Sequence, residues 1–139
     1  EYNVRMGDPE CQVIMPRLKT NIFDIIYASL KNDINKLKIE WHKKNCMTVV
    51  LCAKGYPGKY EKNLPLKNIN RFRLSKNMKI FHAGTKLKNG KLVTSGGRVL
   101  NVTCSGRSFL SIKKIIYKTI KKINWKKGFY RSDIGWRVT

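Results

Sequence analysis

The sequence predicts an α+β fold, with several strands gathered ahead of one closing helix. Residues 45–104 contain a short apolar run, an Asn-Gly hairpin signal and an alternating apolar run, without helices placed regularly between them. An amphipathic stretch then follows at residues 108–124. Strands that do not alternate regularly with helices indicate the α+β class. We therefore expect a small, mainly antiparallel β domain covered by a carboxy-terminal helix.

The chain opens with an acidic run. Three of its eight acidic residues lie within residues 1–12, beside Arg5. If residues 1–3 are extended, Glu1 and Asn3 project from the same face, because side chains alternate along a strand. One carboxylate and one amide oxygen suit Mg²⁺, which also takes waters and substrate phosphates. An exposed strand end followed by an ordinary turn is the alternative.

Residues 16–37 are predicted to form an amphipathic helix. Pro16 suits a first helical turn, and apolar residues recur behind it at helical spacing. We expect this helix to pack on the core and to carry no chemistry. Its apolar positions are Leu18, Ile22, Ile25, Ile26, Leu30, Ile34 and Leu37.

A buried strand is expected at residues 45–53, where a short apolar run is bounded by lysines. The change from a charged helix end to a strand at residues 43–45 is the candidate domain boundary. Residues 55–58, which read Gly-Tyr-Pro-Gly, are predicted to form a turn. The polar residues 59–79 are expected to connect this turn to the next strand, with a short strand or helical turn inside the connection.

The next strand begins at residues 80–81. Residues 86–93 then form a hairpin signal centred on Asn89-Gly90, a pair that suits the positive φ angles of a type I′ turn. Residues 98–104 alternate into a further strand. Ser108 is a candidate cap for the last helix, which is expected to end near Asn124. Its predicted buried stripe contains Phe109, Ile112, Ile115, Ile116, Ile120 and Ile123, and its outer face carries Lys113, Lys114, Lys118, Lys121 and Lys122.

The chain is strongly basic, with 30 lysines and arginines against 8 acids and a net charge of +22. Such a balance ordinarily suggests a nucleic-acid partner. Lysine greatly outnumbers arginine, however, and the aromatic residues do not form an interleaved stacking motif. Lysine, asparagine and isoleucine all have A/T-rich codons, so base composition alone could produce this surface. A nucleic-acid-binding module therefore stays the alternative function, and a solvated lysine face is the favoured interpretation.

The cysteine pattern favours free, mostly buried thiols in a reducing cytosol. Cys11, Cys46, Cys52 and Cys104 form no C-x-x-C pair and no zinc-like spacing with the two histidines. The longest apolar runs are shorter than the ~18 residues that span a bilayer, so no membrane partner is expected.

Five blocks carry more specific information. They read RMGDPECQ at residues 5–12, KGYPG at 54–58, FHAGTKL at 81–87, TSGGRVL at 94–100 and FYRSDIGWR at 129–137. In this order they resemble the signature of glycinamide ribonucleotide synthetases, also called phosphoribosylamine–glycine ligases, which are ATP-grasp enzymes of purine synthesis. The resemblance covers nearly the whole chain.

The resemblance implies a division of the chain. Residues 1–44 would be the last strand and helix of an ATP-grasp region, and residues 45–139 a small carboxy-terminal α+β domain. Because family members are much longer, the resemblance implies that an amino-terminal part of the same enzyme is missing here. We expect residues 1–139 to be inactive alone, and the whole enzyme to be cytoplasmic.

The reaction that the resemblance implies joins glycine to phosphoribosylamine at the expense of ATP, through glycyl phosphate. Mg²⁺ or Mn²⁺ would be held by Glu1 and Asn3, which match the family's metal pair. The candidate catalytic residues are Arg5 and Asp8. Arg5 would face the transferring phosphoryl group or the glycine carboxylate. Asp8 and Glu10 would orient substrate amines or hold Arg5, and for Asp8 a turn-stabilising role is the alternative.

Further substrate-binding candidates lie in the carboxy-terminal part. Gly97 lets backbone approach a substrate, and the guanidinium of Arg98 suits a phosphate or a carboxylate. A glycine bulge with Arg98 in a structural ion pair is an equal alternative. The turn at residues 82–85 is a candidate rim of the site through His82, Gly84 and Thr85, although a lone histidine is more often structural.

Overall fold

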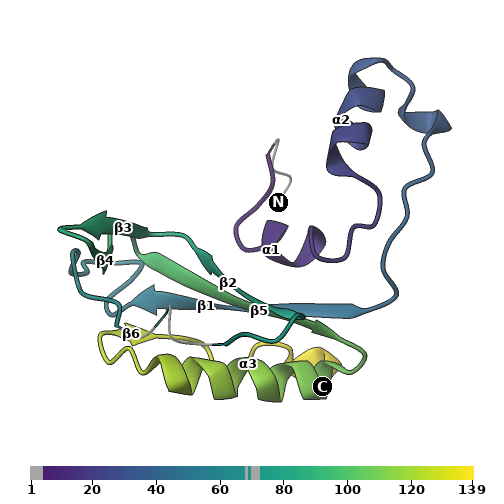
Figure 1. Cartoon of the computed structure of the whole chain (residues 1–139). Coiled ribbons are helices and arrows are strands. Elements are labelled where there is room, and N and C mark those ends of the chain that lie inside the picture. Colours follow the sequence, from purple (N-terminus) through teal and green to yellow (C-terminus); the bar gives the residue numbers. More distant parts are fainter. Residues whose placement is uncertain (1–4, 68, 70–72) are drawn as a thin grey trace.

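A four-stranded antiparallel sheet with helices on both faces forms the body of the molecule (Figure 1). The computed structural model describes residues 5–67, 69 and 73–139. The strand order is β2-β5-β1-β6, and a separate hairpin is made by β3 and β4. The strands are β1 (Asn45–Ala53), β2 (Met78–His82), β3 (Thr85–Lys88), β4 (Lys91–Thr94), β5 (Arg98–Gly106) and β6 (Gly128–Phe129). The predicted α+β class and the mainly antiparallel pairing are confirmed.

The hydrophobic core lies between one face of the sheet and α3 (Phe109–Ile123). The side chain of Ser108 accepts from the Ser111 backbone N–H, as the sequence predicts, and Asn124 ends the helix at a left-handed φ of 48°. Ile115 was expected in the buried stripe but is 44% exposed, because four other isoleucines already fill the face toward the sheet. These four are Ile112, Ile116, Ile120 and Ile123.

The other face of the sheet carries buried polar side chains, and α1 (Cys11–Ile14) contacts β1 and β5. Asn101 and Thr103 of β5 are buried on this face, and the Thr103 hydroxyl donates to Thr48 Oγ1 of β1 at 2.7 Å. The polar side chains alternate with the core residues, as the period of two along a strand requires. The chain segment that precedes the sheet therefore packs on a buried layer of hydrogen-bonding groups.

The hairpin and the first strand match the sequence expectations closely. Asn89 and Gly90 have φ angles of 50° and 69°, so both turn residues are left-handed, as a type I′ turn requires. Strand β1 occupies residues 45–53 as expected. Within the connection at residues 59–79, the Leu66 N–H donates to the Leu92 carbonyl and the Thr94 N–H to the Leu64 carbonyl. This pairing adds a short extended segment beside β4.

The prediction of one helix over residues 16–37 is wrong. The structure has only α2 (Ile22–Leu30) and the short 3-10 helix η1 (Ile34–Lys36) in this range. Asn21 starts α2 by accepting from the Phe23 N–H at 3.0 Å, and Asn32 interrupts it at a φ of 58°. No residue of α2 is buried, so the expected packing on the core is also wrong. Figure 1 shows α2 standing away from the sheet.

All four cysteines are free thiols, as predicted. The expectation that they are mostly buried is wrong, because Cys104 is buried and the other three are only partly buried. In the part of the chain that the structure describes, no helix combines the length and the apolar character needed to cross a membrane.

Candidate functional site

Asp8 is the centre of a polar cluster that joins the amino-terminal segment to the sheet. Its carboxylate Oδ1 accepts from Gln12 Nε2 at 2.8 Å and from Asn101 Nδ2 at 3.1 Å. Its Oδ2 lies 3.4 Å from Arg98 Nε, and Arg98 Nη1 donates to the Asp8 backbone carbonyl at 2.7 Å. We call these four residues the Asp8 cluster. They come from three places in the chain: the turn before α1, α1 itself and strand β5.

A β-bulge brings the two β5 members of the cluster to one face. Leu51 of β1 pairs with Leu100, but the next residue, Cys52, pairs with Arg98, so Val99 is an extra residue in β5. Without the bulge, residues 98 and 101 would point to opposite faces of the strand. The bulge therefore turns Arg98 toward the polar face that also carries Asn101.

Two glycines allow other predicted site segments to pack around Arg98. Gly84 donates from its backbone N–H to the Arg98 carbonyl at 2.7 Å, and a Cβ at Gly84 would lie 2.6 Å from that oxygen. A Cβ at Gly97 would run into the ring of Tyr56. Glycine is needed at both positions because neighbouring parts of the same chain lie too close for a Cβ atom. These close contacts also place the turn that contains His82 beside the start of β5.

His82 and Thr85 contact each other across that turn. His82 Nδ1 lies 3.1 Å from Thr85 Oγ1, and both groups are at the surface. The structure therefore brings His82, Gly84, Thr85, Gly97, Arg98 and Asp8 to the same end of the sheet.

Arg5 and Glu10 flank the Asp8 cluster without joining it. Arg5 is exposed and its Nη1 donates to the neighbouring Met6 carbonyl at 3.0 Å. Glu10 is exposed at the start of α1, with its carboxylate folded against Gly7. Both residues are exposed to solvent.

The predicted metal pair, Glu1 and Asn3, lies outside the described residues, so the magnesium or manganese site stays a prediction. Among residues 5–67, 69 and 73–139, no three or more His, Cys, Asp or Glu side chains gather in a way that would hold a metal ion. Both oxygens of the Asp8 carboxylate already face partners from the chain.

The sequence leaves two roles open for Arg98: a structural ion pair beside a glycine bulge, or the binding of a substrate phosphate or carboxylate. Arg98 forms an ion pair with Asp8 next to a bulge and two glycines, which is the structural arrangement that the sequence allowed. The arginine is still 43% exposed, so part of its guanidinium faces solvent. A role of Arg98 in binding a substrate anion stays a prediction.

Sequence reasoning missed Gln12 and Asn101. The available signal was weak: Asn101 is a lone amide inside an apolar, alternating strand, and Gln12 follows Asp8 at the four-residue spacing of a helix. Both side chains donate to Asp8 Oδ1. The nearby Cys52 thiol has its pKa raised by burial, with a smaller opposing effect from Arg98 and a raising effect from Asp8.

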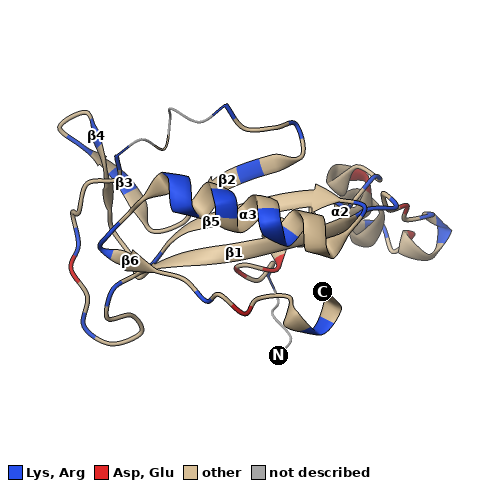
Figure 2. Ribbon diagram, turned by 90° about the horizontal axis from the view of Figure 1, so that it is seen from below, with Lys and Arg blue, Asp and Glu red and all other residues tan. Residues whose placement is uncertain are grey.

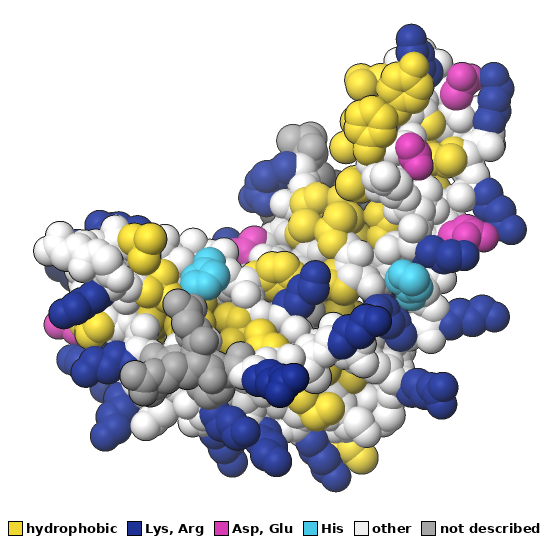
Figure 3. All heavy atoms as spheres, viewed as in Figure 1, with side chains coloured by type: hydrophobic (Ala, Val, Ile, Leu, Met, Phe, Trp, Pro, Cys, Tyr) yellow, Lys and Arg dark blue, Asp and Glu magenta, His cyan; other side chains and the backbone are white. Residues whose placement is uncertain are grey.

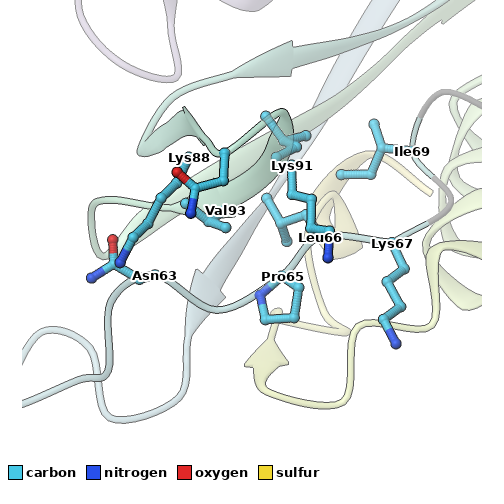
Figure 4. A pocket seen from close by; sticks show the side chains of 10 residues that line it. Asn63, Pro65, Leu66, Lys67, Ile69, Lys88, Lys91 and Val93 are labelled. Carbon is cyan, nitrogen blue, oxygen red and sulfur yellow. The ribbon is translucent and has the colours of Figure 1, made fainter.

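A cavity of about 700 Å³ lies elsewhere, between residues 63, 65–67 and 69 and the β3–β4 hairpin (Figure 4). Lys67, Lys88 and Lys91 line its mouth, and Leu66 and Val93 belong to its apolar wall. None of the described site residues predicted from the sequence lines this cavity. The Asp8 cluster therefore remains the candidate site.

Comparison with known proteins identifies the family. A sequence model described as "Phosphoribosylglycinamide synthetase, C domain" matches residues 46–137, which is most of the chain. The chain belongs to this family. The resemblance seen in the five motif blocks is thereby confirmed.

Relatives of this C domain are phosphoribosylamine–glycine ligases. The chain is 50% identical to the Agrobacterium fabrum enzyme over 138 residues and 43% identical to the chloroplastic Arabidopsis thaliana enzyme over 140 residues, in each case over 99% of this chain. The crystal structure of the Thermotoga maritima enzyme matches with a TM-score of 0.71 and 34% identity over 96% of this chain. The chain spans between about a quarter and a third of the length of these relatives: 32%, 26% and 32%, respectively.

Proposed function

We propose that residues 1–139 are the carboxy-terminal part of a phosphoribosylamine–glycine ligase. The reaction joins glycine to 5-phosphoribosylamine through glycyl phosphate and yields glycinamide ribonucleotide, ADP and phosphate. The observation that carries the proposal is the Asp8 cluster in a member of this family. It brings the RMGDPECQ block into direct contact with the TSGGRVL block, and Gly84 joins the FHAGTKL block to them.

The chemistry of the reaction fits a site rich in cationic donors. Glycine's carboxylate, the nucleotide phosphates and the sugar phosphate are all anionic, so the site must bring like charges together. Arg5 and the exposed edge of Arg98 supply fork-shaped donors for such groups. ATP and Mg²⁺ or Mn²⁺ belong to this proposal, with Glu1 and Asn3 as the metal-binding pair. The metal would neutralise charge on the transferring phosphoryl group.

The partner is proposed to be the preceding part of the same enzyme. Residues 1–44 would end its ATP-grasp region, and α2 would dock on it. The apolar face of α2 supports this docking, because Phe23 is 66% exposed, Tyr27 54% and Leu30 77%. The part of the chain that contains α2 and η1 forms an arm that stands away from the sheet (Figure 1). Figure 3 shows hydrophobic side chains gathered over this arm. We place the complete enzyme in the cytoplasm, with small-molecule substrates and no membrane partner.

The proposal is tested with a chimera. Residues 1–139 replace the matching third of the Agrobacterium fabrum ligase, and ADP release is measured with glycine, phosphoribosylamine and Mg²⁺. We expect turnover that needs all three, and no turnover from residues 1–139 alone. Glu1→Ala and Asn3→Ala should each abolish it. A folded chimera without activity would contradict the proposed function, and activity that survives both substitutions would contradict the metal assignment.

Nucleic-acid binding is the second candidate, and the lysine face of α3 favours it. Lys114, Lys118 and Lys122 are exposed there. Figure 2 shows basic positions recurring along α3. Binding through such a face would weaken steeply with salt, because it releases counterions from the phosphate backbone. We expect no RNA or DNA binding above the level of a charge-matched control protein at physiological salt. Tight binding that is lost in Lys114→Gln/Lys118→Gln would support this second function instead.

A further inference from the structure

Asp8 is held by two amide side chains that approach the same carboxylate oxygen from different elements. Gln12 reaches Oδ1 from α1, and Asn101 reaches it from β5. Asn101 is completely buried, with no exposed surface. A buried amide in the middle of a strand is unusual, because apolar residues normally fill such positions.

The side chains of Gln12 and Asn101 hold the Asp8 carboxylate in one orientation, but they lower the stability of the fold. A carboxylate oxygen only accepts hydrogen bonds, so each amide must turn its NH₂ group toward Asp8. That choice leaves Gln12 Oε1 and Asn101 Oδ1 buried without a hydrogen-bond partner among the residues that the structure describes. A buried acceptor without a partner destabilises the fold. Stability alone therefore does not account for the pair.

The two amides hold Oδ1 of Asp8 and so leave Oδ2, the other carboxylate oxygen, facing Arg98. With Oδ1 held by two donors, Oδ2 faces Arg98 Nε, and the Asp8 backbone carbonyl receives Arg98 Nη1. The guanidinium is thus held by one hydrogen bond and one ion-pair contact, both with Asp8, while the arginine side chain remains 43% exposed. A planar guanidinium fixed by two contacts presents its other donors in a set direction.

We propose that Gln12 and Asn101 are positioning residues that orient Arg98 through Asp8. The consequence is a pre-organised donor for an anionic group of a substrate, either a carboxylate or a phosphate. This role of Arg98 rests on the proposed function, whereas the orientation itself does not. Pre-organisation matters because a donor that is already aimed loses little freedom when the ligand binds.

The orientation is tested in residues 1–139 by NMR, through hydrogen exchange of the Arg98 Nη1 protons, which donate to the Asp8 carbonyl. Asn101→Val removes the buried amide with a residue that suits a strand, and Gln12→Met removes the other amide at similar length. Thr103→Val is the matched control, because it deletes a buried polar group on the same face of β5 outside the cluster. We expect exchange about tenfold faster in the two amide variants and unchanged in the control. Equal exchange in Asn101→Val and the original chain would overturn the proposal.

The consequence for substrates is tested in the chimera, by the KM values for glycine and phosphoribosylamine. Asn101→Val should raise one of them about tenfold with kcat little changed, and Thr103→Val should raise neither. In an Asp8→Ala background, Asn101→Val should have no further effect, since its route to Arg98 is gone. An equal effect in both backgrounds would show that Asn101 does not act through Asp8. If the chimera has no activity, the proposed function fails, while the exchange measurement still decides whether the two amides orient Arg98.

Discussion

At the scale of single residues, close contacts inside the chain explain two features that could be mistaken for ligand binding. Gly97 lies against the ring of Tyr56, and Gly84 lies against the backbone of Arg98. Each glycine leaves room for a neighbouring segment of the same chain. These packed loops then set where the Arg98 guanidinium and the His82 ring emerge.

Gly97→Ala tests this packing. The new methyl group would overlap the Tyr56 ring, so we expect a loss of about 1–3 kcal/mol in the free energy of unfolding. Measuring the same substitution in a Tyr56→Ala background by urea denaturation supplies the control. The penalty should largely disappear there, and an undiminished penalty would mean that backbone strain is the cause.

Glu40 is expected to make the arm around α2 sensitive to acid. Its carboxylate accepts from Lys19 Nζ at 2.7 Å, and this hydrogen bond lowers the pKa of Glu40 below 4.5. A pKa that is lower in the folded state means that the carboxylate stabilises the fold above the unfolded pKa. This contribution is lost as the pH falls through the lower, folded value. Below pH 4.5, the indole NMR signal of the adjacent Trp41 should therefore shift in the original chain and shift much less in Glu40→Gln. Identical titration curves would contradict this assignment.

At the scale of elements, α3 and α2 are both amphipathic, but within the described part of the chain only α3 packs its apolar face on a partner. Helix α3 buries four isoleucines against the sheet, whereas α2 buries none of its residues. Periodicity predicts which side of a helix is apolar, and it does not tell which surface covers that side.

Adjacent isoleucines in α3 offer a matched comparison. Ile116 is completely buried, while Ile115 is 44% exposed. Ile116→Ala should destabilise the chain by about 2–5 kcal/mol, because it leaves a cavity in the core. Ile115→Ala should change the free energy of unfolding by at most about 0.5 kcal/mol, as surface substitutions usually do. Similar losses in thermal denaturation of both variants would show that α3 is rotated relative to its position here.

At the scale of the whole molecule, the arm that carries α2 and the sheet that carries the Asp8 cluster differ in how their apolar side chains are packed. The sheet has its own core, and the arm exposes apolar side chains such as Phe23 and Leu30. Surface patches of this kind mark a binding face. The chain spans about a third of these relatives' length, and the rest of the enzyme is the partner that we propose for this face.

The α2 face is tested by co-expressing residues 1–139 with the upstream part of the Agrobacterium fabrum ligase. Phe23→Ser/Leu30→Ser should abolish co-purification and leave the unfolding transition of residues 1–139 almost unchanged, because both side chains are exposed. Asp24→Ser, on the same helix, is the control and should still co-purify. If the double variant binds as well as the original chain, another surface holds the two parts together.

Local patterns were sufficient for much of the fold. Strand β1, the type I′ turn at Asn89-Gly90 and the cap at Ser108 depend on alternation and turn chemistry within a few residues, so they could be predicted. The length of the helix after Pro16 could not. Residues 17–20 instead pair with residues 40–42, where the Lys19 N–H donates to the Glu40 carbonyl and the His42 N–H to the Arg17 carbonyl. Such pairing between distant segments leaves no periodic signal.

The sequence by itself determined the family, through five blocks in order, and the α+β class, through its hydrophobic patterns. It also named Asp8 and Arg98 as site residues, each in a separate block. Only the tertiary structure decided that these two side chains meet. Their contact depends on an extra residue, Val99, in β5, and on the docking of α1 over the polar face of the sheet. Both are long-range events, because the partners are about ninety residues apart in the chain, at positions 8 and 98.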